Sequence, residues 1–477
     1  MSGLINKIKE VINKMLDKNK IAQKFNFDIA ISAKMMSSIS RWSNIYHNRA
    51  KWLLEDKDLV SLGLGQTIAS EFAKKTTIEL KTKVEGNDQL GKIYKKALRR
   101  IRINLGIGLA KGGFIMKPFF DGNKIVTEYV MQDTFIVTEC DSEGNITGAI
   151  FPSYKVVGKK FYTKLEKVRY ENQIYYIENY LFESNSSDVL GKEVPLTTIK
   201  EWKKIESRIE IQNVERPLFV YFGVPVENEV DPISPLSPSI YAKAVGLLEQ
   251  ADRQFTRSLW EYEGSELAID IDETAFKIDG KTQQRILPKG KERYFRKFSA
   301  EDGDKTFYNV FSPAIRDTSL FNGLNEILIQ IENKCGMSRG TLSKLVDIAK
   351  TATEIESSKQ TMYTTITDIQ NELTQVFEDL AYCIDILMQL YDFGGGTDYL
   401  VSTSWGDSIL VDQEASRRQA LLDKNVGIID EVEYIMETKK MPEREAEKFY
   451  IKMRKREAKY KKMFLETEEE PEGDFDE

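Results

Sequence analysis

The chain has 477 residues, of which 41% are hydrophobic and 30% are charged, and its net charge is −7. This length exceeds what one ordinary hydrophobic core holds, so we expect several domains or one elongated subunit with several parts. The negative charge excludes a protein that is basic overall and binds nucleic acid by its whole surface, although a few placed cations could still contact DNA.

The first segment, MSGLINKIKEVINKMLDKNK, predicts an amphipathic helix with one apolar face. Lysine and glutamate interrupt each of its apolar stretches, so it does not resemble a signal peptide. We expect it to pack against the body of the protein rather than lie on a membrane. No uncharged apolar run of the chain approaches the length that spans a bilayer.

Residues 1 to about 110 predict mainly helices, with a bulky aromatic cluster at Trp42, Tyr46 and Trp52. From about 112 to 222 the pattern changes to strands. The runs GFIMKPFF and KIVTEYVM flank Asp121-Gly122, which predicts a hairpin because this pair supplies positive φ angles. Later runs with polar turns repeat the scheme, so we expect an antiparallel β-rich region.

Five of the twelve prolines fall between Pro217 and Pro238. They exclude a regular helix or a central strand, and we interpret the stretch as a domain linker. A helix over about 240–262 follows, for which Ser237 or Ser239 is the expected cap. Residues 264–316 are short, mixed and polar, with strand-like pieces such as ELAIDID and RYFRKF.

The pattern then predicts a helix over 318–335, a loop over 336–352 and a long helix over 353–391. The long helix carries a seven-residue apolar repeat. Gly394-Gly395-Gly396 ends this helix, and the run YLVSTSW that follows is strand-like. Residues 412–465 are charged and predicted to be helical, and the acidic tail from 466 is expected to be disordered. The repeat consists of Met362, Ile366, Ile369, Leu373, Val376, Leu380, Cys383 and Leu387.

Catalytic and metal-binding patterns are weak. Gly86 to Lys92 matches GxxxxGK, but Ile93 stands where a phosphate-binding loop needs Ser or Thr, so a surface turn is the preferred interpretation. A triad would have to use His47, the single histidine, which lies in an aromatic-rich helical stretch. Asp270 and Asp272 fit a solvated strand face better than a cation site. We therefore expect neither an enzyme nor a cofactor or metal.

The three cysteines, Cys140, Cys335 and Cys383, lie far apart, and at least one is unpaired in any intramolecular scheme. They form no CxxC motif, and their number does not suit a zinc site. A reduced, intracellular place of assembly is the simplest interpretation.

The segment GMSRGTLSKLVDIAKTATEIESSK resembles a motif of bacteriophage portal proteins, in which Gly-x-Ser-x-Gly-Thr, a variable loop and Thr-Ala-Thr-Glu occur in this order. WSNIYHNRAKWLL, the β-rich stretch from GGFIMKPFF and SWGDSILVDQEASRRQALLDKNVGIID resemble further segments of portals from tailed phages of Gram-positive hosts. Together these resemblances cover about residues 35–460. Gly336 to Gly340 also looks like GxSxG, but it follows a helix, so it is not a hydrolase elbow.

The resemblance implies an α+β fold of the portal type, an elongated subunit with named parts. Its parts would be a wing (1–237), a first stem helix (238–263), a small α/β clip (264–316), a second stem helix (317–338), a tunnel loop (339–352), a long helix returning to the wing (353–411), a helical crown (412–465) and the acidic tail (466–477).

The resemblance also implies a ring, usually of twelve subunits, at one capsid vertex, assembled in the host cytoplasm. Double-stranded DNA would pass through it during packaging and ejection. The expected partners are the terminase large subunit, a head-completion or adaptor protein, and the major capsid and scaffolding proteins, with no membrane. The alternative is another oligomeric head or tail protein without a DNA channel.

Two sets of loop residues could meet DNA. Arg339, Lys344 and Lys350 could touch phosphates, with Lys344 near the loop tip, or Leu342, Leu345 and Val346 could form an apolar constriction. The apolar stripes of the stem and long helices could serve ring contacts or face their own subunit. A basic helix would face the capsid interior through Lys448, Lys452, Arg454, Lys455, Arg456 and Lys459.

The stem also carries acidic residues, any of which could line a repelling bore, because a conduit must not hold DNA tightly. These residues are Glu249, Asp252, Glu261, Glu263, Glu326 and Glu332.

Overall fold

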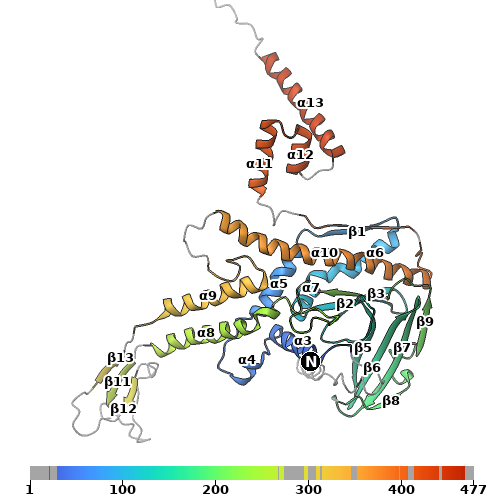
Figure 1. The fold of residues 1–477 in the computed structure, drawn as a ribbon, viewed down its shortest axis with the longest axis vertical. Coiled ribbons are helices and arrows are strands. Elements are labelled where there is room, and N and C mark those ends of the chain that lie inside the picture. The colour runs from blue at the N-terminus through green and yellow to red at the C-terminus, as the bar shows by residue number, and fades with distance from the viewer. Residues whose placement is uncertain are drawn as a thin grey trace, which may run out of the picture. The chain divides into compact units, whose positions relative to one another are not determined.

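The computed structural model describes residues 21, 30–187, 189–266, 268–272, 295–298, 308–311, 314–344, 352–396, 398–406, 413–439 and 443–467. The chain divides into two compact units, residues 1–405 and 406–477. Helices and mostly antiparallel sheets occupy different stretches of the first unit, which confirms the α+β class (Figure 1). No helix of the described part is long and apolar enough to cross a membrane. The predicted helix over residues 1–20 lies outside the described residues.

The region before residue 112 is mainly helical, as predicted. Ser32 caps the first of these helices by accepting a hydrogen bond from the Met35 N–H. Trp42 and Trp52 are buried and Tyr46 is half-buried, so the aromatic cluster belongs to the core. The helices are α3 (Ala33–Tyr46), α4 (Lys51–Glu55), α5 (Leu64–Thr77), α6 (Asp88–Ala97), the 3-10 turn η1 (Leu98–Arg100) and α7 (Ile101–Lys111).

The β-rich region is built from antiparallel hairpins, which confirms the second prediction. β2 (Gly113–Phe120) and β3 (Ile125–Met131) pair as expected around the Asp121 turn, whose carboxylate accepts the N–H groups of Asn123 and Lys124. With β10 (Val220–Gly223) they form a sheet in the order β10-β2-β3.

The larger sheet has the order β4-β5-β6-β7-β8, and β9 pairs with β7. Between β6 and β7, Asn172 and Gln173 both have positive φ, the pair of left-handed residues that a two-residue hairpin turn requires. Buried Ile136, Ile150, Leu165 and Phe182 form part of its core. The strands are β4 (Ile136–Cys140), β5 (Ile146–Val157), β6 (Lys160–Glu171), β7 (Ile174–Ser184), β8 (Lys192–Val194) and β9 (Arg208–Gln212).

A buried charge cluster joins the two sheets. Lys117 of β2 lies 2.7 Å from one carboxylate oxygen of Glu166 on β6, and Lys164 lies 3.0 Å from the other. The Lys117 ammonium also stands 4.7 Å from the centre of the Phe151 ring. A lysine taken from water needs such partners, because an unpaired buried charge is costly.

The proline-containing stretch is part of the first unit and not a linker between domains, which corrects that interpretation. Its backbone is held at Ser237, whose carbonyl accepts from Gln132 Nε2 at 2.8 Å and whose N–H donates to Tyr221 Oη at 3.0 Å. Leu236 is buried beside it. Proline blocks regular structure, but side chains outside the segment satisfy its backbone and hold it in place.

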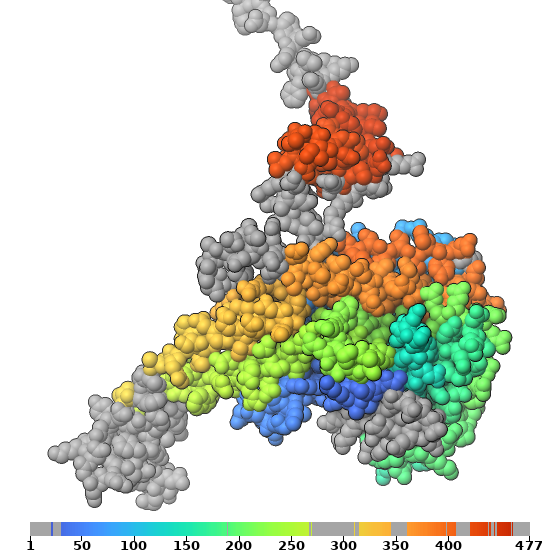
Figure 2. All heavy atoms as spheres, in the orientation of Figure 1, coloured from blue at the N-terminus to red at the C-terminus, as the bar shows by residue number. Residues whose placement is uncertain are grey.

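Two long helices, α8 (Val245–Gly264) and α9 (Asp317–Cys335), lie side by side (Figure 1). In Figure 2 the yellow-green atoms of α8 lie directly against the yellow atoms of α9. A 3-10 turn precedes α8, which has no side-chain cap, so the expected capping by Ser237 or Ser239 is wrong. The chain between the two helices contains β11 (Ala268–Asp272), parallel to β12 (Phe295–Phe298) and antiparallel to β13 (Tyr308–Phe311), close to the two predicted strand pieces.

The long helix α10 (Ala352–Leu390) confirms the predicted 39-residue element to within one residue at each end. All eight members of its seven-residue repeat are buried in their own chain. The stripe packs on α5, α6, β2 and β10. Trp405 fixes the returning chain against this helix by donating from Nε1 to Thr374 Oγ1 at 2.9 Å. Between α10 and Trp405, β14 (Leu400–Ser404) pairs with β1 (Lys81–Glu85).

The described residues of the second unit form the helices α11 (Gln413–Val426), α12 (Glu431–Lys439) and α13 (Glu443–Thr467). Asp430 and Glu433 exchange hydrogen bonds between side chain and backbone, a capping box that starts α12. Ala420, Ile435 and Ala446 are buried between the helices. The two alanines are small enough to allow the helices to approach closely.

Candidate functional site

A buried carboxylate holds the start of the loop between α9 and α10. The Glu332 side chain is 0% exposed. Its Oε1 accepts the N–H groups of Leu342, at 2.5 Å, and Ser343, at 2.9 Å. Its Oε2 accepts the Ser343 hydroxyl at 2.8 Å and the Gly340 N–H at 3.3 Å. Four donors therefore surround one carboxylate, and the loop folds back around the end of its own helix.

The Gly-x-Ser-x-Gly-Thr motif provides the geometry for this wrap. Gly336 ends α9 with a φ of +68°. A Cβ atom there would lie 2.5 Å from Thr365 Oγ1 of α10, so only glycine fits between the two helices. The Thr341 hydroxyl donates to the Ser338 carbonyl at 2.6 Å and closes the turn. The motif is a structural device that joins α9, the loop and α10.

The structure places three of the six loop candidates. Lys344 is exposed, and its backbone N–H donates to Asn325 Oδ1 at 2.7 Å. Arg339 is also exposed, and Leu342 is half-buried. Asn325 and Glu332 of α9 therefore hold the backbone from which the exposed Lys344 side chain extends. The other three candidates, Lys350, Leu345 and Val346, lie outside the described residues.

Four of the six stem acids have partners inside the subunit, so the idea that any of them lines a bore needs correction. Asp252 is buried and accepts from Trp52 Nε1 and the Leu62 N–H. Glu261 is buried and accepts both Nε and Nη2 of Arg316, at 3.0 and 2.7 Å. Glu332 holds the loop. The half-buried Glu249 pairs with Arg253 on the same helix at 2.9 Å, which leaves Glu263 and Glu326 as the exposed acids of this set.

The predicted basic helix exists as α13, and most of its candidate cations are on the surface. Lys448, Lys452, Lys455 and Arg456 are exposed. Arg454 is exposed too, but it also contacts Glu431 at 3.4 Å and Glu457 at 3.3 Å, so its charge is partly neutralised. Lys459 belongs to the helix, and its side chain lies outside the described set.

The phosphate-loop look-alike is a capped helix start. Asn87 accepts the N–H groups of Gln89 and Leu90 and donates to the Gly394 carbonyl, so the N-terminus of α6 is already satisfied. A Cβ atom on Gly86 would lie 2.5 Å from the Asp398 carbonyl oxygen. The segment that starts at Gly86 therefore packs against residues 394–398, and its backbone N–H groups are not available to bind phosphate.

His47 does not form a triad with its neighbours. Burial and the nearby Lys111 charge lower its pKa, while Asp133 opposes them. The Ser43 hydroxyl donates to Asp133 at 2.7 Å, as does the Lys111 ammonium at 2.6 Å. Within the described residues no cluster of three or more His, Cys, Asp or Glu could hold a metal ion.

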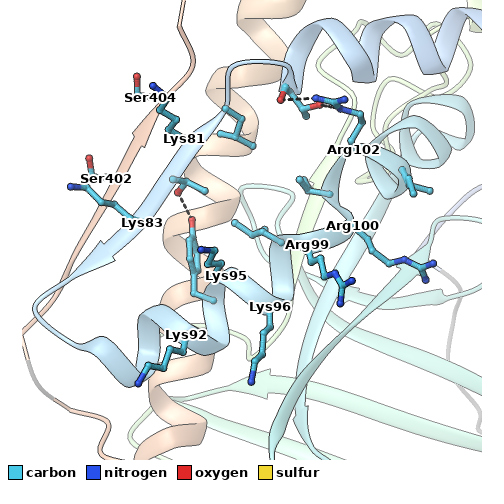
Figure 3. A pocket seen from close by; sticks show the side chains of 17 residues that line it. Lys81, Lys83, Lys92, Lys95, Lys96, Arg99, Arg100, Arg102, Ser402 and Ser404 are labelled. Carbon is cyan, nitrogen blue, oxygen red and sulfur yellow. Dashed lines mark hydrogen bonds between the residues drawn. The ribbon is translucent and has the colours of Figure 1, made fainter. Parts of the chain in front are cut away.

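Sequence reasoning missed a cationic concavity of about 1430 Å³ (Figure 3). The signal was present as a local charge imbalance: residues 81–102 carry eight lysines and arginines and two carboxylates, in a chain with a net charge of −7. Averaging charge over the whole chain hid this segment. Its cations are Lys81, Lys83, Lys92, Lys95, Lys96, Arg99, Arg100 and Arg102.

Comparison with protein-family models identifies a family for the chain. A family model described as "Phage portal protein, SPP1 Gp6-like" matches residues 108–461, about three quarters of the chain. This range includes the β-rich region, α8 to α10, the Glu332 loop and most of α13. Among curated proteins, none matches the chain significantly.

Proposed function

The chain belongs to the SPP1 Gp6-like family of phage portal proteins, and from this premise we propose that its copies form a ring at one capsid vertex through which double-stranded DNA passes. Portal proteins are structural components of the phage capsid. The observation that carries the proposal for this chain is the Glu332 loop. A conduit needs one element of each subunit held at a set depth, and four hydrogen bonds to a buried carboxylate supply that constraint.

Ring closure needs two different patches on each subunit, because neighbours in a ring meet head to tail. The long repeat of α10 is not available for this, since its own chain covers it. The helices α8 and α9 are better candidates. Trp260 is 68% exposed and Tyr262 40% exposed. Such large exposed aromatic side chains favour a subunit contact at this helix pair.

The stem surface carries exposed acids as well as the exposed cations Arg257 and Lys334. Each phosphate that a protein neutralises adds salt-sensitive affinity, so a translocating duplex should meet few cations. The exposed stem acids Glu263 and Glu326 would weaken such contacts. We propose that Lys344 is the closest cation to the duplex and makes a single, weak phosphate contact. The apolar alternative uses Leu342, which is half-buried, together with Leu345 and Val346, which lie outside the described residues.

The finer assignments follow from the same premise. We propose that the ring has twelve subunits, that the chain between α8 and α9 binds the terminase large subunit and then a head-completion protein, and that the ring contacts capsid and scaffolding proteins during assembly. The three-stranded β11–β13 sheet supports a small separate docking module. The exposed cations of α13 support contact between the crown and packaged DNA.

Packaging assays should separate the contributions of the loop and the crown. Replacing Lys344 with glutamate reverses one of the two exposed cations in the described part of the loop, the other being Arg339, so we expect faster loss of packaged DNA and reduced packaging. Deleting residues 448–477 removes the basic face of α13, and we expect a changed length of packaged genome. Both are measured as nuclease-protected DNA per particle, by amount and by length.

Lys200→Glu is a charge-matched control for the loop variant, because Lys200 is an exposed lysine far along the chain from the loop. If Lys344→Glu packaged and retained as much DNA as Lys200→Glu, Lys344 would have no role in contacting phosphates. Genomes of normal length after the deletion would count against a crown contact with DNA.

A further inference from the structure

Strand β1, helix α6 and the η1–α7 segment together surround one cationic concavity (Figure 3). On α6 and η1, Lys92, Lys95, Lys96 and Arg99 follow the three- and four-residue spacing of one helical face. On β1, Lys81 and Lys83 alternate with inward side chains, so both are exposed on one face of the strand. Secondary structure thus places residues from three elements around the same hollow.

The charge of this concavity is largely uncompensated. Its lining contains eight cations and no carboxylate. All eight are exposed. Lys83 has a described acidic partner in Glu85, and Arg102 donates to the Thr77 hydroxyl and carbonyl. Among described residues, Lys92, Lys95, Lys96, Arg99 and Arg100 have no acidic partner. Like charges held this close repel one another, so an anionic ligand would stabilise the arrangement.

The concavity suits a repeating anion better than a single small one. The cations extend along a strand, a helix and a second helix, as a polymer of phosphates requires. Its lining also offers no exposed aromatic ring on which a base could stack. Tyr94, the one aromatic residue of the lining, is 1% exposed and its hydroxyl bonds to Thr82 at 2.7 Å. Eight cations without an exposed aromatic ring favour recognition of a ligand through its phosphate backbone.

We propose that this concavity binds the phosphodiester backbone of double-stranded DNA without sequence preference. The choice of DNA among nucleic acids rests on the proposed function, but the site is separate from the conduit, because none of its residues belongs to the loop or to α13. An acidic protein segment, such as the ETEEEPEGDFDE sequence of this chain, is the competing occupant.

A closed circular duplex distinguishes this site from the bore, since a covalently closed circle cannot thread through a closed ring. We expect the full-length protein to bind such circles in a filter assay, with similar affinity for two unrelated sequences. The triple variant Lys92→Glu, Lys95→Glu, Arg99→Glu should bind at least about tenfold more weakly at 0.1 M salt. The slope of log K against log salt should fall by about 0.9 per lost phosphate contact, or about 2.7 for three.

The matched control is Lys200→Glu, Lys203→Glu, Lys204→Glu, which makes the same charge change at three exposed lysines outside the concavity. The neutral variant Lys92→Gln, Lys95→Gln, Arg99→Gln should lose part of the affinity and keep the thermal midpoint. Equal binding by the charge-reversed and control proteins would overturn the proposal. So would binding of a peptide of residues 466–477 at this site with no binding of circles. If the protein bound closed circles but linear DNA did not pass through its ring, the conduit would be refuted and the proposed DNA site would still be supported.

Discussion

Replacing Glu332 with alanine should release the loop after α9 and lower the free energy of unfolding by about 3 kcal/mol. The substitution removes the acceptor of three backbone N–H groups and one hydroxyl at a fully buried position. Water reaches only some of these donors, so each one left unsatisfied costs free energy. We expect amide exchange at Leu342 and Ser343 to accelerate on the order of 100-fold, since each 1.4 kcal/mol is about a factor of ten.

Glu326→Ala is the matched control, because Glu326 lies on the same helix and its carboxylate is exposed. We expect it to change stability by less than about 0.5 kcal/mol. Glutamine at 332 should fall between the two, because one oxygen still accepts the Leu342 and Ser343 N–H groups. Equal amide exchange rates and equal unfolding free energies for Glu332→Ala and Glu326→Ala would show that the Glu332 carboxylate does not position the loop.

Replacing Glu166 with glutamine should cost a similar amount at neutral pH. Burial opposes ionisation of this carboxyl, but the ammonium groups of Lys117 and Lys164 outweigh it and lower the pKa of Glu166 from 4.5 to about 2. A shift of this size corresponds to about 3 kcal/mol. Because the pKa is depressed in the folded protein, this stabilisation is fully present above pH 4.5 and is lost as the pH falls toward 2.

Urea unfolding of the wild type and of Glu166→Gln across this window measures the effect. The difference in unfolding free energy should be about 3 kcal/mol at pH 7, shrink below pH 4.5, and approach a constant small value near pH 2. Glu128→Gln is the control, since Glu128 is 52% exposed and lies 3.7 Å from Lys117. A wild-type advantage that stays constant with pH would show that the charge of Glu166 does not stabilise the sheets.

Local patterns in the sequence predicted the elements whose cause is local. The repeat of α10 and the hairpin turn at Asp121 depend on neighbours within a few residues, and both were correct. The start of α8 was wrong because serine was assumed to cap it, while a 3-10 turn leads into the helix instead. The pairing of β1 with β14 joins residues more than 300 positions apart, and nothing local in either strand specifies that partner.

The candidate site shows the same division. The motif at 336–341 marked the loop, but its physical reason is Glu332, which sequence reasoning grouped with bore-lining acids. Charge alone does not reveal that a carboxylate faces inward. Asp252 was misjudged for the same reason, since its partners Trp52 and Leu62 come from a distant part of the chain. The solvent exposure of each carboxylate distinguishes the acids that could contact DNA from the acids that stabilise the fold.

Electron microscopy of the assembled protein with a gold label at the loop tests the central claim most directly. The label would be attached through Lys344→Cys in a Cys140→Ser background. The other two thiols are buried, and burial raises the pKa of Cys335 to about 12 and that of Cys383 further, so neither should react. Our account predicts closed rings with an axial opening and gold density at that opening, whereas a Lys204→Cys label should lie away from it. Particles without an axial opening, or rings with the Lys344→Cys label at the outer edge, would contradict it.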